Sequence, residues 1–283
     1  MAEGRFPVTA IAAALTVARS NLLTPPGTPR RYHKVEDDEI LPAIRRLIAD
    51  RPTYGYRRVT ALLNRERAAQ GGDRFNPKRI YRIMKTHHLL LTRGSGRPTY
   101  RHEGTVITLT SNLRWCSDTF VIRCWNGEHL EVAFSLDTCD REVIAWSATT
   151  GAVTGAMIRD LMIETVERRW GPVTSVPRPI QWLSDNGPPY TAEETRTLGA
   201  QLGLVVCTTP VYSPESNGMA EGFIKTFKRD YVYLARLDTA EAVLQRLGEW
   251  FEDYNEKAPH KGLSMRSPRE FLYLNRTVSV CPV

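Results

Sequence analysis

Three acidic residues lie where a carboxylate is either costly or well placed to act on a ligand. Asp118 falls inside the apolar segment 114–120, where a lone charge is unfavourable unless it is paired or bound to a metal ion. Asp185 directly follows the apolar segment 180–184 and so belongs at the carboxyl edge of a sheet, where open α/β sheets place their ligands. Glu221 lies early in a predicted helix. These three side chains are the candidates for chemistry.

Carboxylate oxygens are the ligands that hard divalent cations such as Mg²⁺ prefer. Two such ions, about 3.5–4 Å apart, can hold the attacking and leaving oxygens of an in-line phosphoryl displacement. A structural alternative stays open at this point, because Asp185-Asn186-Gly187 is also a common turn sequence and Asp118 could be an ordinary paired strand residue. The residues alone therefore indicate a candidate metal site and go no further.

The helix that carries Glu221 has two distinct faces. At 100° per residue, its apolar side chains fall within one arc of about 140°; they are Met219, Phe223, Ile224, Phe227 and Tyr231. Glu221, Lys225 and Lys228 fall together within about 60° on the other side. Glu215 is a rival acid, but its loop position favours a solvated or capping role. One acid and two cations are thus expected to share the exposed face.

The segments around these acids predict a mixed sheet. Three β-branched and aromatic segments separated by turns predict an antiparallel meander of strands at 115–124, 130–136 and 142–148. A helix at 154–169, a strand at 180–184, a helix at 191–202 and a strand at 205–209 follow. Two helices, 216–234 and 239–254, are expected to close the chain. The prediction is an α/β fold: a mixed five-stranded sheet with flanking helices.

The part of the chain before the sheet is basic and helical. Residues 1–103 carry a net charge of +11 and the remainder −4, which together give the formal +7. Helices are predicted at 40–48, 57–66 and 78–87, the last with Asn76 as N-cap, Pro77 in its first turn and a buried side of Ile80, Ile83 and Met84. Three short helices with a basic last one indicate a helix-turn-helix module. A helical bundle with a merely solvated basic face is the alternative.

The chain is thereby divided into six parts. We predict a short helical segment at 1–21, a linker at 22–36, the helix-turn-helix domain at 37–93, a second linker at 94–104, the α/β domain with the three candidate acids at 105–275 and a tail at 276–283. The five cysteines contain no C-x-x-C pair, which argues against a disulfide framework and favours a reducing cytosol. No apolar run approaches the roughly 20 residues of a membrane-spanning helix. Segment 8–18 is interpreted as a short helix, with a secretion signal as the alternative.

At this point the sequence resembles a known family, the OrfB-type transposases of bacterial insertion sequences, which belong to the retroviral-integrase-like superfamily. Thirty-five residues separate Asp185 from Glu221, the spacing of this superfamily, and 66 separate Asp118 from Asp185. Lys228 occupies the family's basic position seven residues past the glutamate. Other motifs of the family are matched in the sheet region by Leu136-Asp137 through Arg141 and Trp146, by 213–218, by Tyr254-Asn255 with Pro259-His260, and by 267–271. Upstream, 54–58 and 76–84 resemble the family's helix-turn-helix segment. The resemblance covers about residues 37 to 272.

The resemblance implies an RNase H-like catalytic domain and a DNA transposase. Its acids would be Asp118, Asp185 and Glu221, serving as metal ligands for Mg²⁺, with Mn²⁺ as a substitute. No structural zinc is expected, since His87 and His88 have no cysteine partners nearby. DNA contacts would come from Lys225, Lys228 and Asn217 near the acids, and from Arg57, Arg58, Lys78, Arg79 and Arg82 in the helix-turn-helix. Tyr254 and His260 are candidate supporting residues, with ordinary packing as the alternative.

The implied partners are double-stranded DNA, as the element's terminal inverted repeats and the target, further copies of the chain in a dimer or larger assembly, and an OrfA product as fusion partner. A cytoplasmic location at the bacterial nucleoid and no membrane partner are expected. Two other functions stay open: a non-catalytic DNA-binding regulator of transposition, and an RNase H-like nuclease without strand transfer. The three acids in family register favour the transposase.

Overall fold

The computed structural model describes residues 7–17, 19, 22, 35–92, 108–208 and 218–278. The chain forms two compact units, 1–43 and 44–283. Helix α1 (Val8–Ala14) belongs to the first unit and lies within the predicted helical segment at 8–18. Helix α3 (Val35–Asp50) begins in the first unit and ends in the second. Its first two residues belong to the segment predicted as a linker, 22–36.

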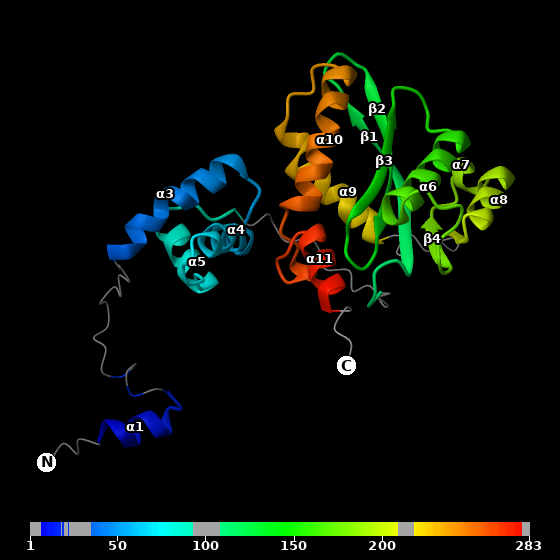
Figure 1. Cartoon of the computed structure of the whole chain (residues 1–283). Helices are drawn as coiled ribbons and strands as arrows, with labels where there is room; N and C mark the ends of the chain where they lie inside the picture. Colours follow the sequence, from blue (N-terminus) through cyan, green and yellow to red (C-terminus); the bar gives the residue numbers. More distant parts are fainter. Residues whose placement is uncertain are drawn as a thin grey trace, which may run out of the picture. The chain divides into compact units, whose positions relative to one another are not determined.

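The predicted helix-turn-helix region is helical as expected. Helix α3 is followed by α4 (Tyr56–Ala69) and α5 (Pro77–Thr86) (Figure 1). The side chain of Asn76 accepts a hydrogen bond from the backbone N of Lys78 at 2.8 Å, which confirms the predicted N-cap. Ile80, Ile83 and Met84 are buried, as predicted from the helical spacing.

The catalytic part is built on the predicted mixed sheet. Its five strands are β1 (Arg114–Arg123), β2 (His129–Asp137), β3 (Val143–Thr149), β4 (Ile180–Ser184) and β5 (Leu204–Thr208). The strand order is β3-β2-β1-β4-β5, in which β1 pairs antiparallel with β2 and parallel with β4 (Figure 1). The strand that carries Asp118 therefore lies at the centre of the sheet.

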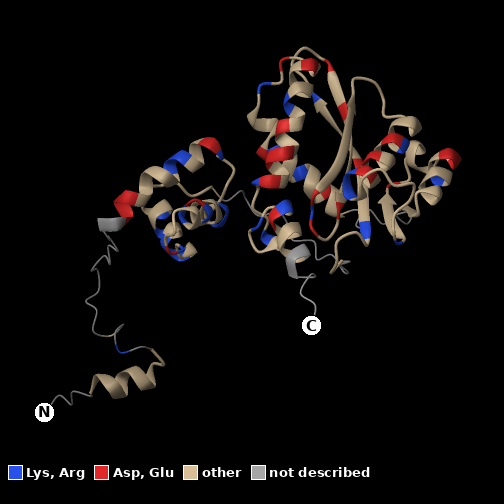
Figure 2. Cartoon of the chain, viewed as in Figure 1, with Lys and Arg blue, Asp and Glu red and all other residues tan. Residues whose placement is uncertain are grey.

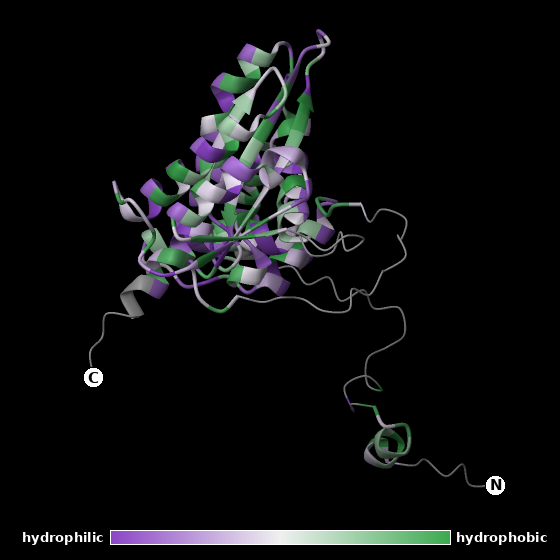
Figure 3. Cartoon of the chain, turned by 90° about the vertical axis from the view of Figure 1, so that its right-hand side faces the viewer, coloured by the Kyte–Doolittle hydropathy of each residue, from purple (hydrophilic) through white to green (hydrophobic). Residues whose placement is uncertain are grey.

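Two hydrophobic cores cover the two faces of this sheet. On one side, Phe120 and Phe134 pack with residues of α9 (Gly218–Asp230) and α10 (Ala240–Glu256). On the other side, Trp115 and Ala133 pack with residues of α6 (Gly155–Trp170). The neighbours Ala133 and Phe134 thus face opposite cores, as the period-two alternation of a strand requires. Figure 3 shows apolar residues concentrated along the strands, with hydrophilic residues on the surrounding helices.

The structure differs from the prediction in three helical segments. The predicted helix 191–202 is present as α8 (Glu193–Gln201), but it begins two residues later, because Ala192 has an extended backbone and separates it from a short helix, α7 (Pro188–Thr191). The predicted helix 216–234 ends at Asp230, and a 3₁₀ turn, η2 (Val232–Leu234), follows it. The expectation that two helices close the chain is wrong, since a short 3₁₀ turn, η3 (Lys261–Leu263), and then α11 (Pro268–Val278) come after α10.

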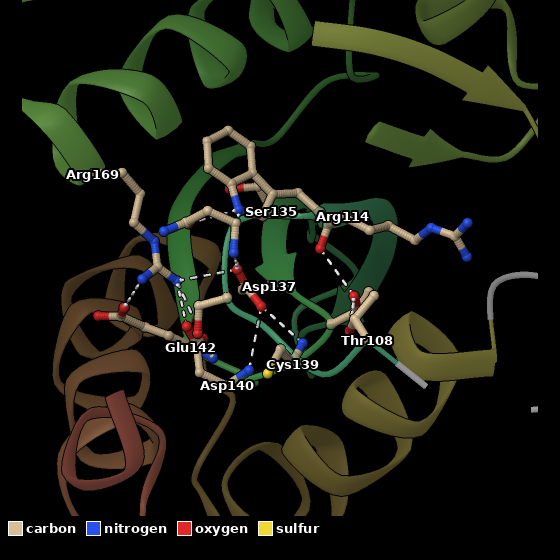
Figure 4. A network of polar contacts seen from close by, with 12 residues as sticks. Thr108, Arg114, Ser135, Asp137, Cys139, Asp140, Glu142 and Arg169 are labelled. Atoms are coloured by element: carbon tan, nitrogen blue, oxygen red, sulfur yellow. Dashed lines mark hydrogen bonds and ion pairs between the residues drawn. The ribbon is translucent and has the colours of Figure 1, made fainter. Parts of the chain in front are cut away.

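A buried polar network holds the β2–β3 turn against α6 (Figure 4). Arg169, with a 2% exposed side chain, pairs with Asp140 at 3.2 Å and with Glu142 at 3.3 Å. Asp137 accepts hydrogen bonds from the backbone N of Cys139 at 2.7 Å and of Asn112 at 2.6 Å, and from the indole of Trp115 at 3.2 Å. Burial, followed by the nearby Asp140, raises the pKa of Asp137 to about 6. The network therefore fixes the end of the sheet at which β2 ends and β1 begins.

Candidate active site

The two aspartates are brought together by the parallel pairing of β1 with β4. Cys116 lies opposite Leu183 in this register. Two residues further along each strand direction come Asp118 and Asp185. Because side chains two residues apart on a strand point to the same face, both carboxylates are placed on the same side of the sheet, beside the carboxyl end of β4. The structure thus joins two residues that are 67 positions apart in the sequence.

The electrostatics of Asp118 include the other two acids. Its carboxylate is partly buried and accepts a hydrogen bond from the backbone N of Thr119 at 2.8 Å. Burial, the largest cause, together with the charges of Asp185 and Glu221 raises the pKa of Asp118 to about 6, against the lowering effect of this hydrogen bond. The carboxylates from the segment after β4 and from α9 are therefore close enough to act on the carboxylate of β1.

Asp185 forms the turn that the sequence suggested, and it remains available to a ligand. Its Oδ1 accepts a hydrogen bond from the backbone N of Gly187 at 3.0 Å, and the residue is exposed. A Cβ added at Gly187 would lie 3.0 Å from that oxygen, so glycine allows the close approach. The turn and the candidate ligand are therefore compatible interpretations of the same residue.

Glu221 lies in the first turn of α9, on the side opposite the buried Phe223 and Phe227. Its Oε2 is 3.7 Å from Nζ of Lys225, and its side chain is 46% exposed. Helix α9 packs on β1, which holds Glu221 beside the strand of Asp118. The predicted division of this helix into an apolar side and an acid-and-lysine side is confirmed.

A buried hydrogen bond that the sequence did not reveal links the segments of the two aspartates. The hydroxyl of Ser117 donates to the carbonyl of Phe134 at 2.8 Å and shares a hydrogen bond with the phenol of Tyr190 at 2.9 Å. Ser117 precedes Asp118, and Tyr190 belongs to α7, five residues after Asp185. A hydroxyl directly before an acid in an apolar strand was the available signal, but nothing local identified its partner.

The lysines of α9 have different surroundings. Lys225 is 79% exposed, whereas Nζ of Lys228 lies 5.5 Å from the ring centroid of Phe120. Burial lowers the pKa of Lys228, and the nearby Arg123 lowers it further. Asn217, expected to contact DNA beside them, lies outside the described residues.

The arginines and lysine predicted to bind DNA in the helix-turn-helix divide into two groups. Lys78 and Arg82 are exposed on α5, Arg79 is partly exposed, and Arg57 is exposed on α4. Arg58 instead donates to Asp230 at 2.7 Å, and its guanidinium lies 3.4 Å from the ring centroid of Tyr54. The structure therefore does not bring Arg58 together with the exposed basic residues, and this state gives no support to its predicted DNA contact. Figure 2 shows basic residues on α4 and α5, and acidic residues along α10.

Tyr254 and His260 lie on the apolar side of α9. Their rings contact each other edge to face with centroids 4.9 Å apart. Together with Phe223 and Arg141 they line a cavity of about 160 Å³. Burial, followed by the charge of Arg141, lowers the pKa of His260 to about 3, so the imidazole is neutral at pH 7. Their surroundings are those of packed groups, on the face of the helix opposite Glu221.

The three acids suit a divalent cation by their chemistry. All their donor atoms are carboxylate oxygens, and a bound cation would offset both the burial and the neighbouring negative charges that raise the pKa of Asp118. Within the described residues, no three His, Cys, Asp or Glu side chains are already gathered tightly enough to hold an ion. The donor atoms of Asp118, Asp185 and Glu221 therefore suit a divalent cation, but the three side chains are not yet gathered around one point.

Comparisons with known proteins agree with this architecture. Residues 109–214 and 203–268 match models of the integrase core domain, and residues 36–95 match an HTH-like domain. A helical DNA-binding module followed by an integrase core defines a polynucleotidyl transferase of the transposase and integrase class. The intasome of simian T-cell lymphotropic virus, solved with a PP2A regulatory subunit, shares the fold: its TM-score is 0.50 at 15% identity, over 85% of this chain and 77% of that one.

The family itself is shown by closer relatives. The chain is 46% identical over 246 residues to the transposase InsD of insertion element IS2A/D/F/H/I/K from Escherichia coli, an alignment that spans 86% of this chain and 81% of the relative. The InsD of element IS2-9 from E. coli K12 matches at the same identity, over 80% of its length. The chain belongs to the insertion-sequence transposases of the retroviral-integrase-like superfamily, as the sequence motifs indicated. Among the described residues, no helix is long and apolar enough to cross a membrane.

Proposed function

We propose that the chain is the catalytic transposase of its element and that Asp118, Asp185 and Glu221 are its catalytic acids. The observation that carries this proposal is the parallel register of Cys116 with Leu183, which places Asp118 beside Asp185; besides burial, the carboxylates of Asp185 and Glu221 both raise the pKa of Asp118, although the three lie on separate segments. Membership of the transposase family supports the proposal, because acids in this spacing resemble that family's catalytic set.

The reaction has two transfers at phosphorus. Water attacks the phosphodiester at the element's end and releases a 3′-OH, leaving a 5′-phosphate on the other side. That 3′-OH then attacks a second phosphodiester, forming one P–O bond and breaking another. In the first round the acceptor is the other end of the element, which gives a circular intermediate that later inserts into target DNA.

The residues of the chain contribute binding, positioning and charge. Asp118, Asp185 and Glu221 hold Mg²⁺ or Mn²⁺, which when bound neutralises developing charge and orients the reacting oxygens. Ser117 and Tyr190 fix the two aspartate segments relative to each other. Exposed cations bind phosphates: Lys225 beside the acids, and on the helix-turn-helix Arg57, Lys78, Arg79 and Arg82, which hold the terminal inverted repeat. Lys228 lies on the same helix as Glu221 and lines the approach to it.

Pairing of two element ends requires more than one copy of the chain, so a dimer or larger assembly forms on DNA. An OrfA product joined by frameshifting would add a further DNA-binding segment. Neither partner changes the assignment of the acids, which can be tested on the chain itself.

Glu221→Gln tests the assignment with the smallest change in shape. We expect Mg²⁺-dependent cleavage and joining of labelled element ends to fall by at least about 100-fold, the scale on which loss of one group that stabilises transition-state charge acts. Glu249→Gln, an exposed acid on α10, is the matched control and should retain activity. Full activity in Glu221→Gln would refute the assignment. Cleavage without joined products in the unmodified chain would indicate a nuclease, and neither product would indicate a regulator.

A further inference from the structure

A groove of about 710 Å³ lies between α4 and α11. Its walls come from α4, from the start of α5 at Pro77, and from the segment 264–274 at the far end of the chain. Its charged lining consists of Arg57, Arg65, Arg74 and Arg266 with one acid, Glu270, so the net charge is +3. None of the functional residues considered so far, apart from Arg57, belongs to it.

The single acid in the groove is already engaged. Arg65 donates to the carboxylate of Glu270, to the carbonyl of Lys257 at 2.7 Å and to the carbonyl of Met265 at 3.3 Å. Its side chain is only 27% exposed. These bonds join α4 to the segment around α11. The ion pair of Arg65 with Glu270 therefore has no net charge and adds no positive charge to the groove.

The rim of the groove keeps its positive charge. Arg57, Arg74 and Arg266 are exposed, and within the described part of the chain none of them has a carboxylate within ion-pairing distance. Arg57 is held in place by the ring of Tyr56, whose centroid lies 5.6 Å from the guanidinium. Guanidinium groups offer paired donors that match phosphate oxygens, and an open groove of this kind leaves those donors facing solvent.

We propose that this groove binds the phosphodiester backbone of the duplex whose bases α5 contacts, so that Arg74 and Arg266 clamp the DNA from opposite sides. The groove starts at Pro77, the first residue of α5, and a helix-turn-helix lays the helix before its recognition helix across the backbone. The C-terminal segment thereby belongs to the DNA-binding surface. The proposal rests on DNA binding as part of the proposed function.

The salt dependence of DNA binding tests this surface. The full chain carrying Asp185→Asn, which prevents cleavage, is titrated onto a labelled duplex of the element's end between 50 and 300 mM salt. Because each phosphate contact contributes about 0.9 to the slope of log K against log salt, Arg74→Gln with Arg266→Gln should reduce the slope by about 1.8. The loss should be equal for a scrambled duplex, since phosphate contacts carry no sequence information.

The matched control is Arg196→Gln with Arg246→Gln, which removes the same charge from exposed positions on α8 and α10. Equal slopes in the two double variants would overturn the proposal. A hydroxyl-radical footprint gives an independent measurement: the groove variant should lose backbone protection next to the bases that α5 contacts, and an unchanged footprint would contradict the groove. If the Asp185→Asn chain with an intact groove bound neither duplex, the proposed function would be refuted. If that chain preferred the duplex of the element's end while the groove variant kept the same salt slope, only the proposed role of the groove would be refuted.

Discussion

Arg58 of α4 donates a hydrogen bond at 2.7 Å to Asp230, the last residue of the helix that carries Glu221. Thr53 donates to the same carboxylate at 2.6 Å, and Arg229 pairs with it at 2.7 Å. The side chain of Asp230 is 1% exposed. The helix-turn-helix region is therefore tied to the end of α9 by a buried ion pair.

Removing that carboxylate should weaken the whole catalytic part. Asp230→Asn leaves the guanidinium of Arg58 without its charged partner, and breaking one side of a buried pair costs about 3 kcal/mol. Asp238→Asn, whose pair with Arg236 is exposed, is the control and should cost about 0–1 kcal/mol. Urea unfolding of both variants measures the difference. Equal midpoints would show that the buried pair does not stabilise the fold.

Acid should destabilise the protein through a second interdomain pair. Burial alone would raise the pKa of Asp253, but hydrogen bonds from Arg51 and from Tyr231, at 2.8 Å, hold it below its usual range. A carboxyl with a lowered pKa stabilises the folded chain above its unfolded pKa of about 3.9, and this contribution is lost as pH falls through the folded pKa. We therefore expect constant stabilisation from pH 7 to about 5 and a loss below.

The free energy of unfolding measured from pH 7 to 3 checks this expectation. Asp253→Asn should be less stable at pH 7 and should lose less stability on acidification than the unmodified chain. Parallel curves for the two proteins would mean that Asp253 titrates alike when folded and unfolded. Asp50→Asn, at an exposed carboxylate that also pairs with Arg51, is the matched control and should cost about 0–1 kcal/mol at pH 7.

Tyr190→Phe should lower turnover without changing DNA affinity. The variant loses the 2.9 Å bond to Ser117 but keeps the ring in the core, so we expect a cost of about 1 kcal/mol in stability and a several-fold decrease in the joining rate. Tyr233→Phe, at a 71% exposed tyrosine, is the control. Ser117→Ala combined with Tyr190→Phe should cost less than the sum of the single changes. Additive effects would show that the two hydroxyls act independently.

Gly262→Ala should disturb the β2–β3 turn. A Cβ at this position would lie 2.1 Å from Nη2 of Arg141, so the guanidinium must leave its place beside η3. The guanidinium is the far end of a flexible side chain and can move aside, so we expect a cost of only about 0.5 kcal/mol. Gly248→Ala on α10 meets Trp146 only at an ordinary 3.8 Å and should stabilise the helix by up to about 1 kcal/mol. Thermal melting separates the two, and a stabilised Gly262→Ala would contradict the tight packing.

Local patterns predicted the sheet and the arrangement of α9. Alternation along the strands and the apolar stripe of Phe223 and Phe227 follow from the geometry of one element at a time, which a sequence shows directly. The acids were candidates because of their positions in an apolar strand, after a strand and early in a helix, and their spacing, which resembles that of a known family, favoured a catalytic role. Sequence reasoning thus located the candidate site before any tertiary contact was known.

Pairings between distant segments could not be predicted in the same way. Arg58 looked like its basic neighbours, but its partner Asp230 comes 172 positions later and no local signal connects them. Tyr190 and Ser117 are 73 positions apart and give no joint pattern. Helix α11 was missed because its segment was interpreted through a family motif alone, although Pro268 stands at a position typical of the first turn of a helix.

The order of these pairs along the chain bears on how damaged copies of the gene behave. Arg58 and Arg65 lie before residue 92, and the acids that pair with them, Asp230 and Glu270, lie after Glu221. A copy interrupted between these regions would encode a product that lacks Glu221 and has two more guanidinium groups without an acidic partner than the intact chain. Under the proposed function, we expect such a product to occupy DNA without cutting it, so that decayed copies would inhibit the intact ones.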